Sequence, residues 1–372
     1  MSGLPAIRAP SAREPTSSTH DPDNTFPRAR WRDDVYSSGV PNALRSLTIL
    51  SVVLFVSTRA DAVILFGSAT RNTSAPTGTL SGSGWQFQGQ FAGFLGTPIS
   101  SKYFITAQHI GGSVGQDFQY DGNTYFTDQA VNIPNTDLRL WRISGTFPTW
   151  APLYDPAVDG SERNKSLVVI GRGTQRGDPV YAPAVPVEPE PIPNPDNPVL
   201  NRDLGPTGQR LRGWRWGIED RVQAWGQNVI ADVFDTDDFG RLLYFTFDQD
   251  GGPNEAHLSA GDSGGAVFIN SGGVWKLAGI NFAVDGPFRE TPTSPEFLGA
   301  LFDVTGMYFD NPPRAIAPAG GFAVPSGAYA SAISGSLPFI LSTINPPTFG
   351  GVPEPSSAVA LALLALCRRR RQ

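Results

Sequence analysis

The sequence predicts an all-β protein, and three observations support this class. The 372 residues include 41 glycines and 34 prolines together with 23 phenylalanines and 8 tryptophans, which is typical of short strands joined by tight turns. Nine apolar or aromatic runs of strand length recur, and glycine, proline or Asx residues separate most of them. No amphipathic helical pattern lies between the runs, which favours a sandwich or a pair of barrels over a parallel sheet. The runs are Trp85–Leu95, Tyr103–Thr106, Leu138–Ile143, Leu167–Ile170, Val222–Ile230, Leu242–Phe247, Ala266–Ile269, Trp275–Val284 and Phe297–Val304.

The N-terminal part of the chain has the composition of a targeting segment. Residues 1–39 are rich in Pro, Ser, Arg and Asp without apolar periodicity, which predicts a disordered leader and suggests a true translation start downstream of the first methionine. In the segment 40–62, Arg45 precedes a mostly apolar run, 47–56, and an Ala-Asp-Ala triplet ends the segment at Ala62. This order predicts a signal peptide cleaved after Ala62. A buried strand or helix is the alternative for the apolar run.

The C-terminal segment 346–372 contains three parts in a fixed order. Pro353-Glu354-Pro355 is followed by an apolar stretch, 358–366, and by four arginines at 368–371. This order resembles the PEP-CTERM sorting tail of Gram-negative bacteria. The resemblance implies a short transmembrane anchor held by its arginines at the cytoplasmic face until an exosortase-type enzyme removes it. The body would then reach the extracellular space or the outer cell surface. A plain membrane anchor is the alternative.

The part between these ends is acidic and free of cysteine. Seven basic and six acidic residues precede residue 63 and four arginines follow residue 354, which leaves 17 basic and 28 acidic residues and a net charge of −11. Such a body repels phosphate backbones, so nucleic acid is not expected as a partner. The only cysteine, Cys367, lies in the tail, so the exported body would depend on its core and not on disulfides.

Two further segments have recognisable patterns. The proline-rich stretch between Gly177 and Asp203 predicts an exposed polyproline-like loop. Apolar residues spaced by three or four from Tyr329 to Ile344 predict a C-terminal helix with a kink or restart at Pro338.

The segment Gly261-Asp262-Ser263-Gly264-Gly265 carries the strongest chemical signal. A serine attacks a carbonyl usefully only where its oxygen is exposed and backbone N–H groups can hold the developing oxyanion. Gly261 permits the backbone conformation that turns its N–H beside that of Ser263, and the two glycines after the serine leave room for substrate. The motif therefore predicts a nucleophile, Ser263, with an oxyanion hole formed by Gly261 and Ser263. A plain turn is the alternative.

A nucleophilic serine needs a base, and the base needs an acid to fix its tautomer. Of the three histidines, His20 lies in the leader, which leaves His109 and His257. His109 follows an apolar run that ends in small and polar residues, so we expect it at a strand end. Asp137 directly precedes an alternating strand and is the candidate acid. Taken singly, a satisfied core histidine and a solvated turn residue are the alternatives.

Together these pieces resemble the chymotrypsin-like serine peptidases, in which T-A-A-H-C-type, D-I-A-L-L-type and G-D-S-G-G segments follow one another. The resemblance spans roughly Gly84 to Asn345 and implies a peptidase domain, 63–345, of two Greek-key six-stranded antiparallel β-barrels with a C-terminal helix. It implies a secreted, monomeric serine endopeptidase that hydrolyses polypeptides through an acyl-enzyme, with His109 as base, Asp137 as orienting acid and Ser263 as nucleophile. No metal or cofactor is expected.

The chain departs from the family pattern in several ways. Gln108 and Ile110 replace the usual alanine and cysteine, and the spacing of 28 residues from His109 to Asp137 is short. His257 stands six residues before the serine, where the family has its specificity pocket, and disfavours cleavage after Lys or Arg. No I-V-G-G segment is present, and whether a free Val63 amine pairs with Asp262 is left open.

Two other functions were weighed against the peptidase. A catalytically inactive trypsin-fold protein for surface or matrix binding is the main alternative. An α/β-hydrolase esterase is excluded because no histidine follows Ser263. The acidic stretches 235–238 and 248–252 lack EF-hand spacing and predict solvated turns.

Overall fold

The computed structural model describes residues 6–7, 63–181, 209–309, 313–316 and 323–345. The chain divides into two compact units, residues 1–9 with 60–372 and residues 10–59, and every described residue belongs to the first unit. The predicted signal peptide, the sorting tail and nearly all of the leader and the proline-rich loop lie outside the described residues. The prediction of a peptidase domain over 63–345 stays a prediction.

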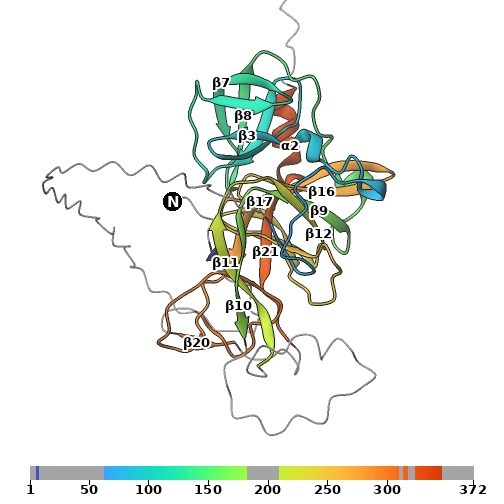
Figure 1. The fold of residues 1–372 in the computed structure, drawn as a ribbon. Coiled ribbons are helices and arrows are strands. Elements are labelled where there is room, and N and C mark those ends of the chain that lie inside the picture. Colours follow the sequence, from blue (N-terminus) through green and yellow to red (C-terminus); the bar gives the residue numbers. More distant parts are fainter. Residues whose placement is uncertain (1–5, 8–62, 182–208, 310–312, 317–322, 346–372) are drawn as a thin grey trace, which may run out of the picture. The chain divides into compact units, whose positions relative to one another are not determined.

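Six antiparallel strands close into a barrel in the first part of the described chain (Figure 1). Its interior is aromatic: Phe104 stacks on Phe118 with ring centroids 4.0 Å apart, and Trp141 lies beside them. Burial alternates along β6 and in part along β8, as expected for strands with one face in a core. The strands, in barrel order, are β3 (Gly89–Phe91), β4 (Phe94–Pro98), β5 (Tyr103–Ala107), β8 (Leu138–Ser144), β7 (Asn123–Asn132) and β6 (Asp117–Tyr120).

The second part of the chain forms an antiparallel sheet that is not closed. Its order is β12-β9-β16-β17-β21-β14-β13, and β1 (Ala6–Ile7) pairs in parallel with β17. The predicted second barrel is therefore not shown by the described strands. β12 is the last strand of this sheet, and its outer edge pairs with backbone groups outside the sheet. The N–H of Trp225 donates to the carbonyl oxygen of Asn72, and the N–H of Gln227 donates to that of Asn254. The strands are β9 (Ser166–Gly171), β12 (Ala224–Val229), β13 (Asp232–Thr236), β14 (Gly240–Thr246), β16 (Ala266–Ser271), β17 (Val274–Asp285) and β21 (Gly327–Ala332).

Smaller elements complete the described fold. A three-stranded sheet has the order β10-β11-β18, and β15 pairs with β2 and β19 with β20. Two 3-10 turns and one short helix, α1, lie in the connections. Their bounds are β2 (Ile64–Leu65), η1 (Gly78–Leu80), η2 (Trp85–Phe87), α1 (Pro156–Asp159), β10 (Thr174–Tyr181), β11 (Leu211–Glu219), β15 (Ala256–His257), β18 (Gly299–Leu301), β19 (Tyr308–Phe309) and β20 (Arg314–Ala315).

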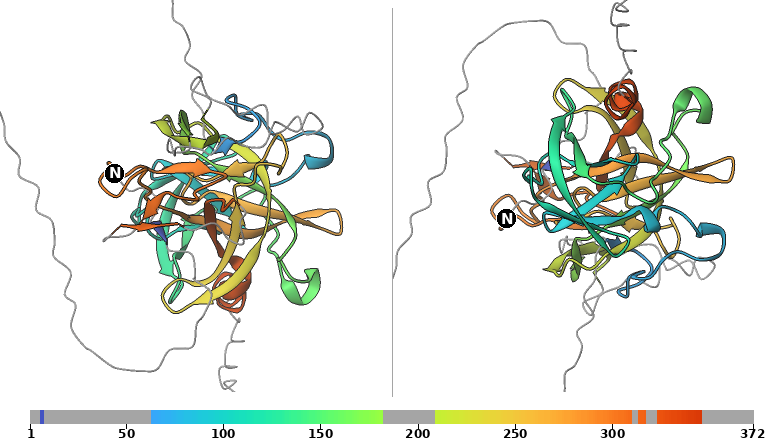
Figure 2. Two further views of the ribbon diagram at one scale, coloured as in Figure 1. Left: turned by 90° about the horizontal axis from the view of Figure 1, so that it is seen from below. Right: turned by 90° about the horizontal axis from the view of Figure 1, so that it is seen from above.

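The C-terminal helix, α2 (Ile333–Ile344), is shorter than predicted. Tyr329 belongs to β21, where its Cα partner is Tyr244 of β14. The prediction that the helix begins at Tyr329 is therefore wrong, because the helix begins at Ile333, after this strand. The helix continues through Pro338 and buries Ile333, Leu337 and Ile340 in the same apolar cluster as the barrel interior. Both views in Figure 2 show α2 on the outside of the strands, seen nearly end on. The mostly β class with one closed six-stranded barrel and a C-terminal helix is confirmed.

Candidate active site

The three predicted triad residues lie at the ends of strands that the fold brings together. His109 follows β5, and Asp137 immediately precedes β8. These strands are neighbours in the barrel with Ala107 opposite Leu138, so the end of one and the start of the other meet at the same rim. Ser263 lies in the connection between β15 and β16. The short spacing of 28 residues from His109 to Asp137 therefore does not prevent contact.

A continuous line of hydrogen bonds joins the three side chains. Nδ1 of His109 lies 2.6 Å from Oδ2 of Asp137, and Nε2 of the same ring lies 2.8 Å from Oγ of Ser263. The second carboxylate oxygen of Asp137 accepts the backbone N–H of His109 at 2.9 Å. Both oxygens of Asp137 are thus used to position the histidine. The arrangement has the geometry of a nucleophile, a base and an orienting acid, while the catalytic roles stay predictions.

The serine is more deeply buried than its sequence context predicts. Ser263 has no exposed surface, and Asp137 is 8 % exposed. The barrel packs directly on the serine turn, since a Cβ added to Gly264 would lie 2.6 Å from the carbonyl oxygen of Leu95 and 3.2 Å from Ile110. The expectation of an exposed serine oxygen is therefore wrong in this structure. A substrate can reach Oγ only after neighbouring groups move.

The backbone around the serine leaves two N–H groups available at the predicted oxyanion hole. The N–H groups of Asp262, Gly264 and Gly265 donate to backbone carbonyls. In the described part of the chain, those of Gly261 and Ser263 donate to no protein acceptor. Gly261 has a φ of +91°, and a Cβ there would lie 2.9 Å from the carbonyl oxygen of Arg172. Glycine is thus required at this position by both conformation and space.

Asp262 holds the serine turn in place through hydrogen bonds to its carboxylate. Its carboxylate is fully buried and accepts the N–H of Gly173 at 2.8 Å, the N–H of Ser259 at 2.7 Å and the hydroxyl of Ser259 at 2.9 Å. Burial raises the pKa of Asp262 to about 6, although the bonds from Ser259 oppose the increase. The described bonds of Asp262 do not include Val63, and the pairing of a free Val63 amine stays open.

Asn281 is a second anchor, and sequence reasoning missed it. Its side-chain amide is buried in β17 and donates to the carbonyl oxygens of Ile170 and Asp262, each at 2.9 Å. Its backbone N–H and carbonyl pair with Gly265 and Gly264. The available signal was an asparagine within an otherwise apolar strand, because a buried amide needs hydrogen-bond partners.

His257, the predicted specificity residue, lies in the core. It has no exposed surface, and its Nδ1 and Nε2 lie 2.7 Å and 3.2 Å from the carbonyl oxygens of Leu258 and Gly327. Burial lowers the pKa of His257 to about 4, so the ring is neutral at pH 7. A role in specificity stays a prediction, and it would require an opening that this conformation does not have.

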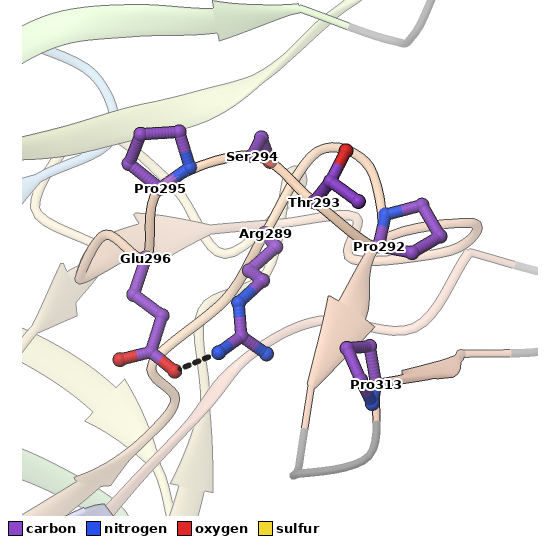
Figure 3. A pocket seen from close by; sticks show the side chains of 7 residues that line it. All are labelled: Arg289, Pro292, Thr293, Ser294, Pro295, Glu296 and Pro313. Carbon is purple, nitrogen blue, oxygen red and sulfur yellow. Dashed lines mark hydrogen bonds and ion pairs between the residues drawn. The ribbon is translucent and has the colours of Figure 1, made fainter.

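Two hollows in the described structure lie away from these residues. One of about 540 Å³ is bordered by the loop from Arg289 to Glu296 and by Pro313, with an ion pair between Arg289 and Glu296 (Figure 3). The other, of about 520 Å³, lies at the barrel end near Lys102 and Ile344. Neither is bordered by a member of the predicted triad.

Comparisons with known proteins supply no family. No protein-family model matches the chain, and no curated protein matches it. One solved structure that resembles it is the passenger domain of plasmid encoded toxin, an autotransporter enterotoxin from enteroaggregative Escherichia coli. The TM-score is 0.36 and the identity 11 %, over 67 % of this chain and 21 % of that one. The chain thus spans about a fifth of that structure, and a likeness of this extent carries no functional argument.

The described ranges, 63–181, 209–309, 313–316 and 323–345 together with 6–7, contain neither a metal-binding cluster nor a membrane-spanning helix. No group of three or more His, Cys, Asp or Glu side chains is placed there to hold a metal ion. Within the same ranges, no helix has the length and apolar character needed to cross a membrane. The predicted anchor at 358–366 lies outside them.

Proposed function

We propose that the protein is a serine endopeptidase that cleaves polypeptides through an acyl-enzyme. The observation that carries this proposal is the unbroken line of hydrogen bonds from Asp137 through His109 to Ser263. It ends beside two backbone N–H groups without a protein acceptor among the described residues. A binding protein needs neither arrangement.

The chemistry follows from these positions. Nε2 of His109 takes the proton of Ser263 as Oγ attacks the scissile carbonyl. The N–H groups of Gly261 and Ser263 would hold the oxyanion. His109 then gives the proton to the leaving amine, and water repeats the sequence on the acyl-enzyme. Asp137 keeps the proton on Nδ1 before attack and stabilises the imidazolium that forms.

The two targeting segments of the sequence support an exported setting. We propose that a signal peptidase cleaves after Ala62 and that an exosortase-type enzyme removes the tail by cleavage near the Pro-Glu-Pro box at 353–355. The product would be a monomeric extracellular or surface enzyme without cofactor, nucleic acid or metal. Recovery of surface-located protein that retains residues 1–39 or the arginines at 368–371 would contradict this proposal.

An inactive surface or matrix protein is the second candidate, because Ser263 has no exposed surface. The test is a fluorophosphonate probe on the full chain, since such probes react only with an activated serine. We expect labelling of the wild type and of Ser113→Ala, which alters an exposed serine. Ser263→Ala and His109→Ala should both lose labelling. Unlabelled wild type that also cleaves no member of a broad peptide library would establish the inactive alternative.

A further inference from the structure

Two arginines lie beside the candidate oxyanion hole. Arg172 immediately follows β9, and its Nη1 donates to the carbonyl oxygen of Gly93 at 3.3 Å. Arg221 follows β11, and its Nη1 would lie 2.7 Å from a Cβ at Gly93. The guanidinium carbon of Arg221 stands 6.0 Å from the ring centroid of Phe94. Both guanidinium groups therefore converge on the Gly93–Phe94 turn of the barrel.

This turn lies at the same end of the β4–β5 strand pair as His109. β4 and β5 are antiparallel with Thr97 opposite Ile105. Gly93 directly precedes β4 and His109 follows β5, so both lie towards the same end of this strand pair. His109 must give its proton to the leaving amine. We therefore expect the substrate residues that follow the scissile bond to pass over the barrel rim that carries His109 and Gly93.

The two arginines differ in their charge partners. Arg221 pairs with Glu219 at 3.1 Å, and both side chains are partly exposed. Arg172 is half-buried and forms no ion pair with any residue that the structure describes. The nearby carboxylate of Asp220 pairs instead with Arg71 at 3.3 Å. Burial and the like charge of Arg221 lower the pKa of Arg172, and the negative charge of Asp220 opposes this decrease.

A carboxylate already fits next to the serine turn. Oε1 of Glu219 lies 3.4 Å from the position that a Cβ of Gly261 would take, and it is the atom that Arg221 binds. Guanidinium groups bind carboxylates through charge-assisted and often bidentate hydrogen bonds. Among the residues that the structure describes, Arg172, by contrast, donates only to the neutral carbonyl of Gly93.

We propose that Arg172, assisted by Arg221, binds a carboxylate of the substrate within the first two residues after the scissile bond. The inference rests on the proposed peptidase function and narrows its substrates to polypeptides with Asp or Glu at these positions. The carboxylate replaces the carbonyl of Gly93 as the acceptor of Arg172. The net charge of the body is negative and would repel an acidic substrate. The preference for Asp or Glu therefore depends on the local positive charge of Arg172 and Arg221.

The test compares matched peptides that carry Glu or Gln at the first or second position after the cleaved bond. With the full chain, we expect a kcat/KM ratio of Glu to Gln peptide of about 10, the scale of one charge-assisted hydrogen bond. Arg172→Gln should reduce this ratio to about 1, and Arg172→Lys should retain part of it. Arg163→Gln, a matched change at an exposed ion pair with Asp232, should leave the ratio unchanged.

Two outcomes would overturn the proposal. A wild-type kcat/KM ratio of Glu to Gln peptide near 1 would show that the enzyme does not prefer a carboxylate at these positions. An unchanged ratio in Arg172→Gln, with both peptides equally slowed, assigns Arg172 a purely structural role in bridging to Gly93. Binding of the same peptides to Ser263→Ala, measured by fluorescence anisotropy, separates this site from the peptidase function. Preferential binding of the Glu peptide without any wild-type cleavage would retain the anion site and refute the peptidase.

Discussion

Replacing Asp137 by asparagine should leave the fold intact and remove most of the turnover. Oδ1 of Asp137 accepts the backbone N–H of His109, and Oδ2 faces the ring Nδ1 at 2.6 Å. Because a backbone N–H can only donate, the amide oxygen of asparagine must stay at the Oδ1 position. Its NH₂ group then faces Nδ1, which becomes an acceptor and moves the ring proton to Nε2. A protonated Nε2, 2.8 Å from Oγ, cannot accept the proton of Ser263.

The expected loss of kcat follows from the loss of His109 as a base while Ser263 and the oxyanion-hole N–H groups stay in place. A wrong histidine tautomer in a serine triad reduces kcat by roughly 10⁴-fold, which corresponds to about 5.5 kcal/mol of activation free energy. Asparagine has the shape of aspartate and keeps the hydrogen bond from the His109 N–H, while the bond to Nδ1 is reversed and loses its charge. We therefore expect the free energy of unfolding to change by only about 1 to 2 kcal/mol.

The assay is kcat/KM on a peptide that the wild type cleaves, with urea unfolding of the same preparations. The matched control is Asp128→Asn, which changes an exposed carboxylate paired with Arg142 on the same barrel and should alter neither quantity. Activity of Asp137→Asn within tenfold of wild type would refute the tautomer argument. A loss of stability of several kcal/mol would show that the activity fell through unfolding.

Two further predictions concern stability. Burial holds the pKa of His257 at about 4, below its ordinary value of 6.5, so the unfolded chain binds the proton first as the pH falls from 6.5 towards 4. Relative to His257→Gln, the wild type should therefore lose about 2 kcal/mol of unfolding free energy between pH 7 and pH 4.5; a pH-independent difference in urea unfolding would contradict this. In the barrel, Phe104→Ala should cost about 3 to 5 kcal/mol, because Phe104 has no exposed surface and stacks on Phe118. Phe126→Ala, at a site 55 % exposed, should cost under about 1 kcal/mol, and equal costs would refute the packing argument.

Strand positions were predictable from the sequence wherever one apolar run makes one strand. The run Trp85–Leu95 was read as a single strand, but the structure divides it into a 3-10 turn and the strands β3 and β4. The reversal occurs at Ala92 and Gly93, with φ of +52° and +84°. A left-handed alanine is rare, so composition could not reveal this turn.

Two other differences from the sequence predictions arise from contacts that are distant in sequence: the helix start is wrong, and the second barrel is not shown. Tyr329 fits a helical spacing, but its hydroxyl donates to the partly buried Asp285 at 2.8 Å, and its backbone pairs in β21. The second barrel was expected to close, yet β12 pairs at its outer edge with Asn72 and Asn254. No local pattern specifies which backbone groups occupy a strand edge.

The residues of the candidate site were predictable from the sequence, but the burial of Ser263 was not. The order of His109, Asp137 and Ser263 indicated three groups that the structure brings within hydrogen-bond distance. Leu95 and Ile110 pack against Gly264, next to Ser263, and both lie more than 150 residues away from the serine in the chain. Exposure at such a site depends on packing, and a motif alone does not determine it.

The serine turn is held by hydrogen bonds to two polar side chains, one of which is a buried carboxylate. Asp262 accepts three hydrogen bonds and Asn281 donates two, and no cysteine is available to do this work in the described ranges. The pKa of Asp262 is raised to about 6 from 3.8, so ionising this carboxylate in the folded state costs roughly 3 kcal/mol by pH 7. An apolar residue would avoid that cost but would accept no N–H from Gly173 or Ser259. The chain therefore retains an unfavourable buried charge at the turn that positions Ser263. Departures from the most stable packing are expected at functional sites.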